Sequence, residues 1–392
     1  MGLLRSVPDK TKVLVIIPSG FCYGLQHISF SLFNTSRDKI EPFFLISKWS
    51  DGEFEREIQR MGFKFSHSWL GMFSRKMDAK NIKMSLHALS RLPALYRDFW
   101  KLYKSFKPDI LFFANHHELI LLYPALAFIR RPVVCHMHDP APALSFQKRT
   151  FSFYMKKVKK ILAISENVKQ RVIALGGKEN EITVLHNGIM IPATPDFERD
   201  NTLCKKAQWP DDVFIIGITG QMSATKGHED LLNAFAKAYK NNKALRLIIG
   251  GRPSYPFFQT LQTLIDSLAL KDVVYFSGWQ EDASSFFRSI DLYVLASRHD
   301  EGYGLVIAEA MAFSKPTVIT ASGGAVELVK DGITGFIVPK RDIDALAQKI
   351  ETFATDNVLY ENARRAAYAY VKSHFDLQKK AIEFSNFLEK VK

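Results

Sequence analysis

Residues 297–324 contain the stretch that decides the fold, Ser-Arg-His-Asp-Glu-Gly-Tyr-Gly-Leu-Val-Ile-Ala-Glu-Ala-Met-Ala followed, from 315, by Lys-Pro-Thr-Val-Ile-Thr-Ala-Ser-Gly-Gly. A helical pattern starts near Gly304, and its apolar residues predict a buried face. Those residues are Leu305, Ala308, Ala310, Met311 and Ala312. We expect Pro316 to stop this helix, because proline lacks the amide that a helix needs.

Two glycines and two glutamates give this stretch its chemistry. Gly302 and Gly304 leave the backbone bare at the positive end of the helix, where an anion could approach the amides. Glu301 lies in the loop before the helix, and Glu309 lies a little over one turn inside it. The arrangement suits a molecule with hydroxyl groups on both sides of a phosphate, which is the chemistry of a nucleotide sugar.

Taken singly, each of these features is common in α/β proteins, but the whole string resembles the signature of the family-4 retaining glycosyltransferases. In that family a loop Glu-Gly/Pro-Phe/Tyr-Gly-Leu leads into Glu-Ala-Met-Ala. The resemblance implies that Glu301 orients the sugar and that Glu309 holds the ribose hydroxyls. It also implies retention of the anomeric configuration without a protein nucleophile. The donor-binding residues expected here are Gly302, Tyr303, Gly304, Leu305 and Glu309.

Apolar, β-rich runs alternate with helical patterns along the whole chain, which predicts parallel sheets covered on both faces. In the first half the runs are Val13–Pro18, Phe43–Ile46, Ile110–Phe113, Val133–Met137, Ile161–Ile164 and Ile182–Leu185. In the second half they are Phe214–Gly220, Leu245–Gly250, Val273–Phe276, Leu292–Ala296, Thr317–Thr320 and Gly335–Val338. Two such series predict two doubly wound α/β domains.

The expected boundary is the proline-punctuated stretch 190–195. The resemblance implies the GT-B fold, in which two Rossmann-like domains face each other and a C-terminal helix crosses back to the first. We therefore expect an acceptor-binding domain over 1–190 plus 376–392, and a nucleotide-sugar-binding domain over 191–375.

A second loop predicts a diphosphate site. Lys226 lies just ahead of a helix that starts near His228, after the run Phe214–Gly220. The family's loop usually reads Gly-Arg-Leu-x-x-x-Lys-Gly, with both cations on the diphosphate. Lys226 matches, whereas Gln221 replaces the arginine, so one of the two expected charges is missing.

Other predicted site residues follow strands. Gly251 ends one run, and Trp279 follows another at a position that resembles the family's base-contacting segment. In the first domain, Gly24 belongs to a strand-to-helix turn expected to approach phosphate. We assign His138 to the donor sugar or the acceptor and regard His136 as structural. The expected catalytic residues are Glu301, Lys226 and His138.

No metal or other cofactor is expected. The Asp-x-Asp sequence at Asp342 and Asp344 precedes a helical pattern, so helix capping is the preferred interpretation. The 3 cysteines are scattered and lack metal-ligand spacing. No apolar run is long enough for a membrane span, and the first ten residues lack the apolar core of a signal peptide. We expect a cytoplasmic protein.

The net charge of +13 belongs to the first half, where residues 1–190 contain 29 Lys and Arg against 15 Asp and Glu. Basic and aromatic residues at helical spacing favour a helix lying on an anionic membrane surface. The predicted membrane or acceptor residues are Arg75, Lys76, Lys80, Lys83, Arg91, Arg97, Trp100, Lys101 and Lys104. No nucleic-acid-binding motif accompanies them, so no nucleic-acid partner is expected.

These observations favour a retaining, metal-independent transferase that moves a sugar from a nucleotide diphosphate sugar, by family frequency a UDP-sugar. The acceptor would be a saccharide or lipid-linked glycan in surface polysaccharide assembly, on the cytoplasmic face of the membrane. Three alternatives remain: a GDP-mannose-dependent mannosyltransferase, a nucleotide-sugar epimerase of the same fold, and a non-catalytic binder of anionic surfaces. A nucleotide-cofactor oxidoreductase is disfavoured, because no Gly-x-Gly-x-x-Gly motif follows the first strand of either domain.

Overall fold

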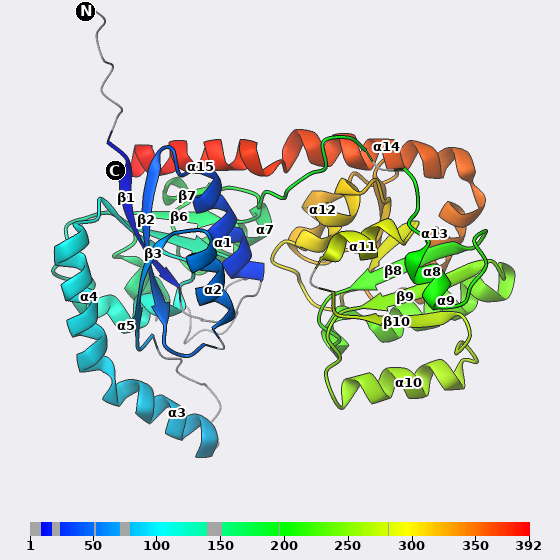
Figure 1. The fold of residues 1–392 in the computed structure, drawn as a ribbon, viewed down its shortest axis with the longest axis horizontal. Helices are drawn as coiled ribbons and strands as arrows, with labels where there is room; N and C mark the ends of the chain where they lie inside the picture. Colours follow the sequence, from blue (N-terminus) through cyan, green and yellow to red (C-terminus); the bar gives the residue numbers. More distant parts are fainter. Residues whose placement is uncertain are drawn as a thin grey trace, which may run out of the picture. The chain divides into compact units, whose positions relative to one another are not determined.

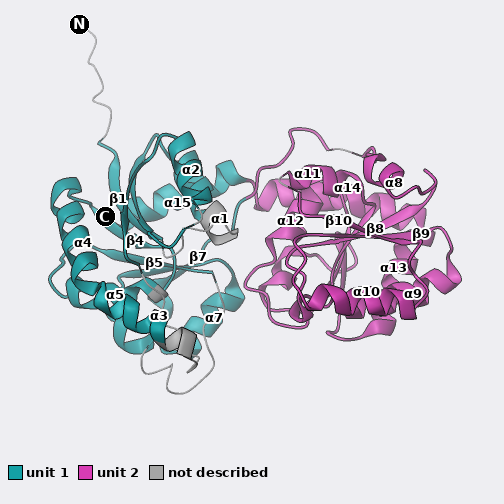
Figure 2. Cartoon of the chain, turned by 60° about the horizontal axis from the view of Figure 1, so that its bottom comes forward, with its two compact units in different colours: residues 1–188, 377–392 teal, residues 189–376 magenta. Residues whose placement is uncertain are grey.

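The computed structural model describes residues 9–17, 24–50, 52–70, 79–138, 151–195, 197–280 and 282–392. It divides into two compact units (Figure 2). Unit 1 comprises Met1–Gly188 and Leu377–Lys392, and unit 2 comprises Ile189–Asp376. The sequence-based division placed the corresponding borders at 190/191 and 375/376, two residues and one residue away from these.

Unit 1 is built on a seven-stranded parallel sheet in the order β3-β2-β1-β4-β5-β6-β7. The strands are β1 (Thr11–Ile17), β2 (Ile40–Ser47), β3 (Lys64–Ser68), β4 (Ile110–Phe113), β5 (Val133–Met137), β6 (Lys160–Ala163) and β7 (Ile182–Val184). Strand β1, in the interior of the sheet, is almost entirely apolar and buried from Val13 to Ile17. Helices on both faces of the sheet account for this continuous burial (Figure 1).

The helices of unit 1 come from both ends of the chain. Those with described bounds are α1 (Gly24–Thr35), α2 (Glu53–Arg60), α3 (Ala79–Ser90), α4 (Leu92–Phe106), α5 (His117–Leu126), α7 (Glu166–Ala174) and α15 (Leu377–Val391), with a short 3-10 turn η1 (Glu179–Glu181). Phe384 of α15 packs edge-on against Phe33 of α1 and Phe112 of β4, with ring centroids 5.1 and 5.7 Å away. The last helix is therefore part of the unit 1 core, as the fold prediction required.

Strand β3 was not predicted, since the sequence analysis identified only six strands in this half. Its sequence is Lys-Phe-Ser-His-Ser, and it lies at the edge of the sheet beside β2. Only Ser68 is buried, while Lys64 is exposed. An edge strand of this kind carries no continuous apolar run, so hydrophobic patterning does not reveal it.

Unit 2 is built on a six-stranded parallel sheet in the order β10-β9-β8-β11-β12-β13. The strands are β8 (Phe214–Thr219), β9 (Leu245–Gly250), β10 (Val274–Gly278), β11 (Leu292–Leu295), β12 (Thr317–Thr320) and β13 (Gly335–Val338). The order reverses between β8 and β11, and in such sheets ligands bind outside the carboxyl ends of the strands at this switch point.

The helices of unit 2 pack on this sheet around a core that includes Leu231, Phe235, Val294 and Ile350. They are α8 (Thr202–Lys206), α9 (His228–Asn241), α10 (Phe257–Ser267), α11 (Ala283–Arg288), α12 (Leu305–Ala312), α13 (Ile343–Thr355) and α14 (Asn357–His374), with 3-10 turns η2 (Ala224–Lys226) and η3 (Gly324–Leu328). Among the described residues, no helix combines the length and the apolar character that crossing a membrane requires.

The end of α12 differs from the expectation. The helix stops at Ala312, and Ser314 adopts the left-handed conformation with φ 58°. The turn at Ser314 therefore ends the helix before Pro316 can act. Pro316 lies just before β12, where its missing N–H costs the strand little.

Candidate functional site

The loop after β8 brings Lys226 to the carboxyl end of the unit 2 sheet. The loop forms η2, and α9 begins at His228, as predicted. Between them Gly227 has φ 71°, and a Cβ there would lie 1.8 Å from the carbonyl oxygen of Ala296. Only glycine lets this turn rest against the end of β11. The local fold thus places Lys226 beside the loop that follows β11.

Lys226 forms an ion pair with Glu301. Its Nζ lies 2.8 Å from Oε1 and 2.9 Å from Oε2 of the carboxylate, although the two residues are 75 positions apart. Ser297 also donates a hydrogen bond to Glu301 Oε1. The side chains are 33% and 16% exposed, so a ligand can reach both. The structure brings two of the three predicted catalytic residues together, and it adds Ser297, which the sequence did not single out.

Arg298 fixes the same two loops to each other. Its Nε and Nη2 donate to Asp230 at 2.8 and 2.6 Å, and Nη1 donates to Glu229. Its backbone N–H donates to the carbonyl of Thr225 at 2.9 Å. The hydrogen bonds to Asp230 raise the pKa of Arg298 further above its usual value. This arginine holds the loop that carries Lys226, and no sequence motif predicted its role.

The backbone of Glu301 is held from the other side by the turn after β12. Glu301 forms a bridge with Gly323, and Gly324 N–H donates to the Glu301 carbonyl at 2.8 Å. A Cβ on Gly323, which has φ 55°, would lie 2.4 Å from that carbonyl oxygen. Gly323, near the end of the stretch 297–324, therefore allows this close approach.

Helix α12 begins at the predicted place, with Gly304 at its N-cap in the left-handed conformation. No side chain caps it and its first turn holds no acidic residue. Its N-terminus therefore keeps the positive end of the helix dipole available to an anion. Gly302, Gly304 and Leu305 are half-buried around this end.

Glu309 lies inside α12, half-buried, and accepts no hydrogen bond from any residue within the described parts of the chain. Desolvation raises the pKa of Glu309 from 4.5 to about 7. A carboxylate in this state gains from new hydrogen-bond donors, such as ligand hydroxyl groups.

The side chain of Tyr303 is buried, which limits how this predicted donor-binding residue could contact a ligand. It was predicted among the donor-binding residues, but its side chain is only 3% exposed, and its ring packs edge-on against Phe375 at 6.1 Å. Burial raises the pKa of Tyr303 well above its usual value. Any contact from Tyr303 to a ligand at the surface must come from its backbone.

The turns after β8, β9 and β10 lie against one another. Gly251 has φ 116°, and a Cβ there would lie 1.9 Å from the Gly220 carbonyl oxygen. Gly251 N–H also donates to the Gly278 carbonyl at 2.9 Å. Trp279 follows, 50% exposed, with the Arg252 guanidinium 4.3 Å from its ring centre. The predicted Gly251 and Trp279 therefore lie at the carboxyl edge of this sheet, and Arg252 is an addition.

In unit 1 the predicted histidine lies at the end of β5. His138 is buried, and its Nε2 lies 2.9 Å from Nδ1 of buried His136. Burial lowers the pKa of His138 to about 3 and that of His136 well below its usual value. Both rings are therefore neutral at physiological pH. Gly24 begins α1, whereas the rest of its predicted turn, 19–23, lies outside the described residues.

The sequence analysis missed a buried carboxyl in the same unit. Glu118, in the first turn of α5, is 2% exposed, and burial raises its pKa to about 8. Its charge contributes to the raised pKa of Cys135, which lies within β5. One acidic residue in an apolar helix gives no sequence signal that it is buried.

The predicted basic surface is only partly described. Its exposed members are Lys83, Arg91, Arg97, Lys101 and Lys104, while Arg75, Lys76 and the side chain of Lys80 lie outside the described residues. The apolar residues of α4, by contrast, are buried in unit 1, and they are Leu95, Phe99, Leu102 and Phe106. Trp100 is half-buried against Phe99. The apolar stripe of α4 is therefore core and does not face a membrane.

The acidic pair at 342–344 caps a helix, as expected. Asp342 Oδ1 accepts a hydrogen bond of 2.9 Å from the Ala345 N–H at the start of α13. Asp344 instead pairs with Lys237 at 2.5 Å. Within the part of the chain that the structure describes, no three His, Cys, Asp or Glu residues are grouped as metal ligands.

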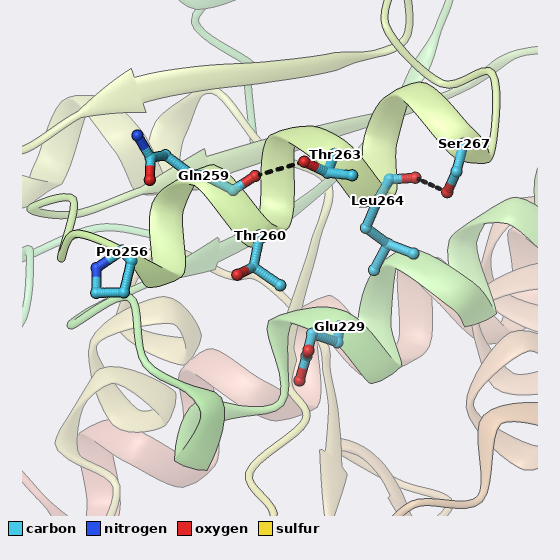
Figure 3. A pocket seen from close by; sticks show the side chains of 7 residues that line it. All are labelled: Glu229, Pro256, Gln259, Thr260, Thr263, Leu264 and Ser267. Carbon is cyan, nitrogen blue, oxygen red and sulfur yellow. Dashed lines mark hydrogen bonds between the residues drawn. The ribbon is translucent and has the colours of Figure 1, made fainter.

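A pocket of about 480 Å³ opens between the start of α9 and helix α10 (Figure 3). It is lined by Glu229, Pro256, Gln259, Thr260, Thr263, Leu264 and Ser267. None of the predicted site residues lines it, and its one link to the site is Glu229, which pairs with Arg298. We place the candidate site around Lys226 and Glu301 rather than here, because charge and uncapped backbone converge there.

Solved structures share this fold across nearly the whole chain. The crystal structure of Anabaena Alr3699/HepE in complex with UDP matches with a TM-score of 0.82 and 20% identity, over 97% of this chain and 100% of that chain. A glycosyltransferase from Rickettsia africae ESF-5 matches with a TM-score of 0.80 and 23% identity, over 98% and 99%. The protein therefore has the GT-B fold.

Two family models match the chain, one in each half. The model for Glycosyltransferase Family 4 matches residues 75–191, and that for Glycosyl transferases group 1 matches residues 200–370. The chain belongs to the family-4, group 1 glycosyltransferases.

Curated relatives match about half of this chain. The capsular polysaccharide biosynthesis glycosyltransferase CapM of Staphylococcus aureus is 31% identical over 229 residues, which are 56% of this chain and 58% of that protein. The N-acetyl-alpha-D-glucosaminyl L-malate synthase of Bacillus anthracis is 28% identical over 219 residues, 54% and 56% respectively. The chain thus spans less than two thirds of the length of these relatives.

Proposed function

We propose that the protein is a retaining glycosyltransferase that moves a sugar from a UDP-sugar to a saccharide or lipid-linked acceptor in surface polysaccharide assembly. The observation that carries the proposal is the Lys226–Glu301 pair, reachable from solvent at the carboxyl edge of the unit 2 sheet. Family membership supports glycosyl transfer. The UDP complexes of Anabaena Alr3699/HepE and the capsular role in the name of the S. aureus relative support the finer assignment.

The residues divide the chemistry between them. When the bond between the anomeric carbon and the diphosphate oxygen breaks, negative charge develops on the diphosphate. Lys226 and the N-terminal amides of α12 stabilise that charge. Glu301 accepts hydrogen bonds from the sugar hydroxyls, and Glu309 accepts them from the ribose. His138, a neutral ring, acts as a hydrogen-bonding partner of sugar or acceptor.

The new bond forms on the face from which the diphosphate leaves, so the configuration is retained. The acceptor hydroxyl attacks the anomeric carbon from that face, and its proton passes to the departing phosphate oxygen. No protein nucleophile is needed, and the charge on the phosphate is balanced by Lys226 and backbone amides without a metal ion.

The first test is thermal unfolding with UDP, GDP and their sugars, in buffer that contains EDTA. A ligand that binds only the native state raises the melting temperature by mass action. We expect UDP to stabilise the protein and Glu309→Ala to abolish the shift. Stabilisation by GDP and GDP-mannose alone would replace the uridine donor by a guanosine donor, and no shift with any nucleotide would overturn the proposal. The UDP-sugar that stabilises the protein best is then incubated with it, and the products are identified. Release of UDP indicates sugar transfer, whereas an isomeric UDP-sugar indicates epimerisation.

A further inference from the structure

The diphosphate site predicted from the family pattern lacks a cation, because Gln221 stands where the family usually has arginine. Gln221 is exposed, two residues beyond the end of β8. A glutamine donates hydrogen bonds but carries no charge to set against a diphosphate. The structure shows where a replacement lies.

Strand register places Arg252 on the turn beside Gln221. Strands β8 and β9 pair in parallel, with Thr219 opposite Gly250. Two residues further along each strand come Gln221 and Arg252. The two turns also touch, since Gly251 approaches the Gly220 carbonyl too closely for any Cβ. An arginine therefore follows the strand next to β8, at the same level of the sheet as Gln221.

The guanidinium of Arg252 is positioned but not neutralised. It lies 4.3 Å from the ring centre of Trp279, and it has no hydrogen bond or ion pair with any residue in the described parts of the chain. A guanidinium stacked on an aromatic face keeps its edge N–H groups free to donate.

Three other cations at this edge are already engaged. Lys226 pairs with Glu301, Arg298 with Asp230 and Glu229, and Lys340 with Asp300 at 2.5 Å. No carboxylate pairs with Arg252 among the described residues. Its planar guanidinium can donate two parallel hydrogen bonds to two phosphate oxygens, which a lysine ammonium does less well.

We infer that Arg252, held by Trp279, supplies the second cation of the diphosphate site. It would do so in place of the family's usual arginine, whose position Gln221 occupies. The inference rests on the proposed function and refines it. It assigns Trp279 a positioning role for the arginine in addition to any contact with the base.

The test is isothermal titration of UDP and of uridine into the wild type and three variants. Arg252→Ala should weaken UDP binding about tenfold, the loss expected for one charge-assisted contact, and leave uridine binding unchanged. Adding Gln221→Arg to Arg252→Ala should restore UDP binding, because it returns the charge to the neighbouring turn.

The matched control is Arg246→Ala. Arg246 lies at the opposite end of β9 and also faces a tryptophan, with its guanidinium 5.9 Å from the Trp209 ring centre. This variant removes an equal charge and a similar contact from the same unit, and it should bind UDP like the wild type.

UDP binding by Arg252→Ala equal to that of the wild type would overturn this inference alone. Equal weakening of UDP and uridine would also overturn it, since the arginine would then serve the base. If the wild type binds no nucleotide at all, the proposed function falls together with the inference.

Discussion

The Lys226 ammonium and the Glu301 carboxylate neutralise each other across two contacts of 2.8 and 2.9 Å. In the proposed reaction Lys226 binds the diphosphate of the donor, and Glu301 binds its sugar. A diphosphate must draw Lys226 away from Glu301, and a sugar must replace the lysine on the carboxylate. The pair therefore opposes binding of the diphosphate alone and favours binding of the complete donor.

Glu301→Gln separates these two effects. Removing the negative charge beside Lys226 should strengthen UDP binding about fivefold, which corresponds to ~1 kcal/mol for a partly exposed pair. The same change should lower kcat by about 10²–10³, because the sugar loses a carboxylate acceptor. Calorimetry with UDP and initial rates with the sugar donor measure the two quantities. Weaker UDP binding together with a lower kcat would show that Glu301 does not restrain Lys226.

Gly227→Ala tests whether the approach to Ala296 positions the catalytic loop. An alanine Cβ would meet the Ala296 carbonyl oxygen at 1.8 Å, in addition to the cost of its positive φ. We expect a loss of about 2–4 kcal/mol in the free energy of unfolding, measured by urea denaturation. Gly332→Ala is the control, since Gly332 has φ 73° but nothing within 4 Å of a built Cβ. The control should lose only about 1 kcal/mol, and equal losses would show that the contact is unimportant.

The carboxyl of Glu309 should make the ligand-free protein less stable as pH rises. Its pKa is raised from 4.5 to about 7, so between these values the unfolded chain loses the proton while the folded chain keeps it. Stability is therefore lost from about pH 4.5 upward, and the penalty is complete above pH 7. Glu309→Gln should be more stable than the wild type at pH 8 by on the order of 1–3 kcal/mol, and similar at pH 4.5.

Urea denaturation of both proteins at the two pH values measures this difference. The glutamine variant should also lose binding of UDP, since an amide cannot replace a carboxylate acceptor for two ribose hydroxyls. A variant that is no more stable at pH 8 would contradict the burial of the charge.

Membrane contact, if electrostatics and two exposed leucines provide it, should depend on α3. Leu86 and Leu89 are 60% and 48% exposed, near the exposed cations Lys83 and Arg91. Changing both leucines to serine should lower binding to vesicles containing phosphatidylglycerol about tenfold, and high salt should lower it further. Ile382→Ser removes an equally exposed apolar residue, 58% exposed, from α15 of the same unit and should have no effect. Unchanged sedimentation of the double variant with vesicles would show that α3 does not provide the membrane contact.

Most of the fold could be predicted because its strands are continuous apolar runs. Strands such as β4, β5 and β12 begin and end at the predicted residues. The polar edge strand β3 could not be found in this way. Basic and aromatic residues at helical spacing predicted a helix on a membrane surface, but the apolar residues of α4 are buried in unit 1, since helical spacing shows that a stripe exists and not what covers it.

The site was predictable where a local motif carries it and not where folding assembles it. Lys226 and Glu301 follow from their loops, but their ion pair depends on how two strands align. Arg298 and Arg252 look like ordinary surface arginines in the sequence, and only the structure shows that one is paired with carboxylates and the other is not.

The placement of Phe384 in the unit 1 core has a consequence for synthesis of the protein. Unit 2 is a continuous segment, so its core can close as soon as residues 189–376 have left the ribosome. Unit 1 begins earlier, but the ring that fills the space beside Phe33 and Phe112 is translated only after the whole of unit 2. Unit 1, which contains the first half of the chain, should therefore complete its folding after unit 2. A nascent chain stalled before α15 should contain a folded unit 2 and an incompletely folded unit 1 that chaperones can bind.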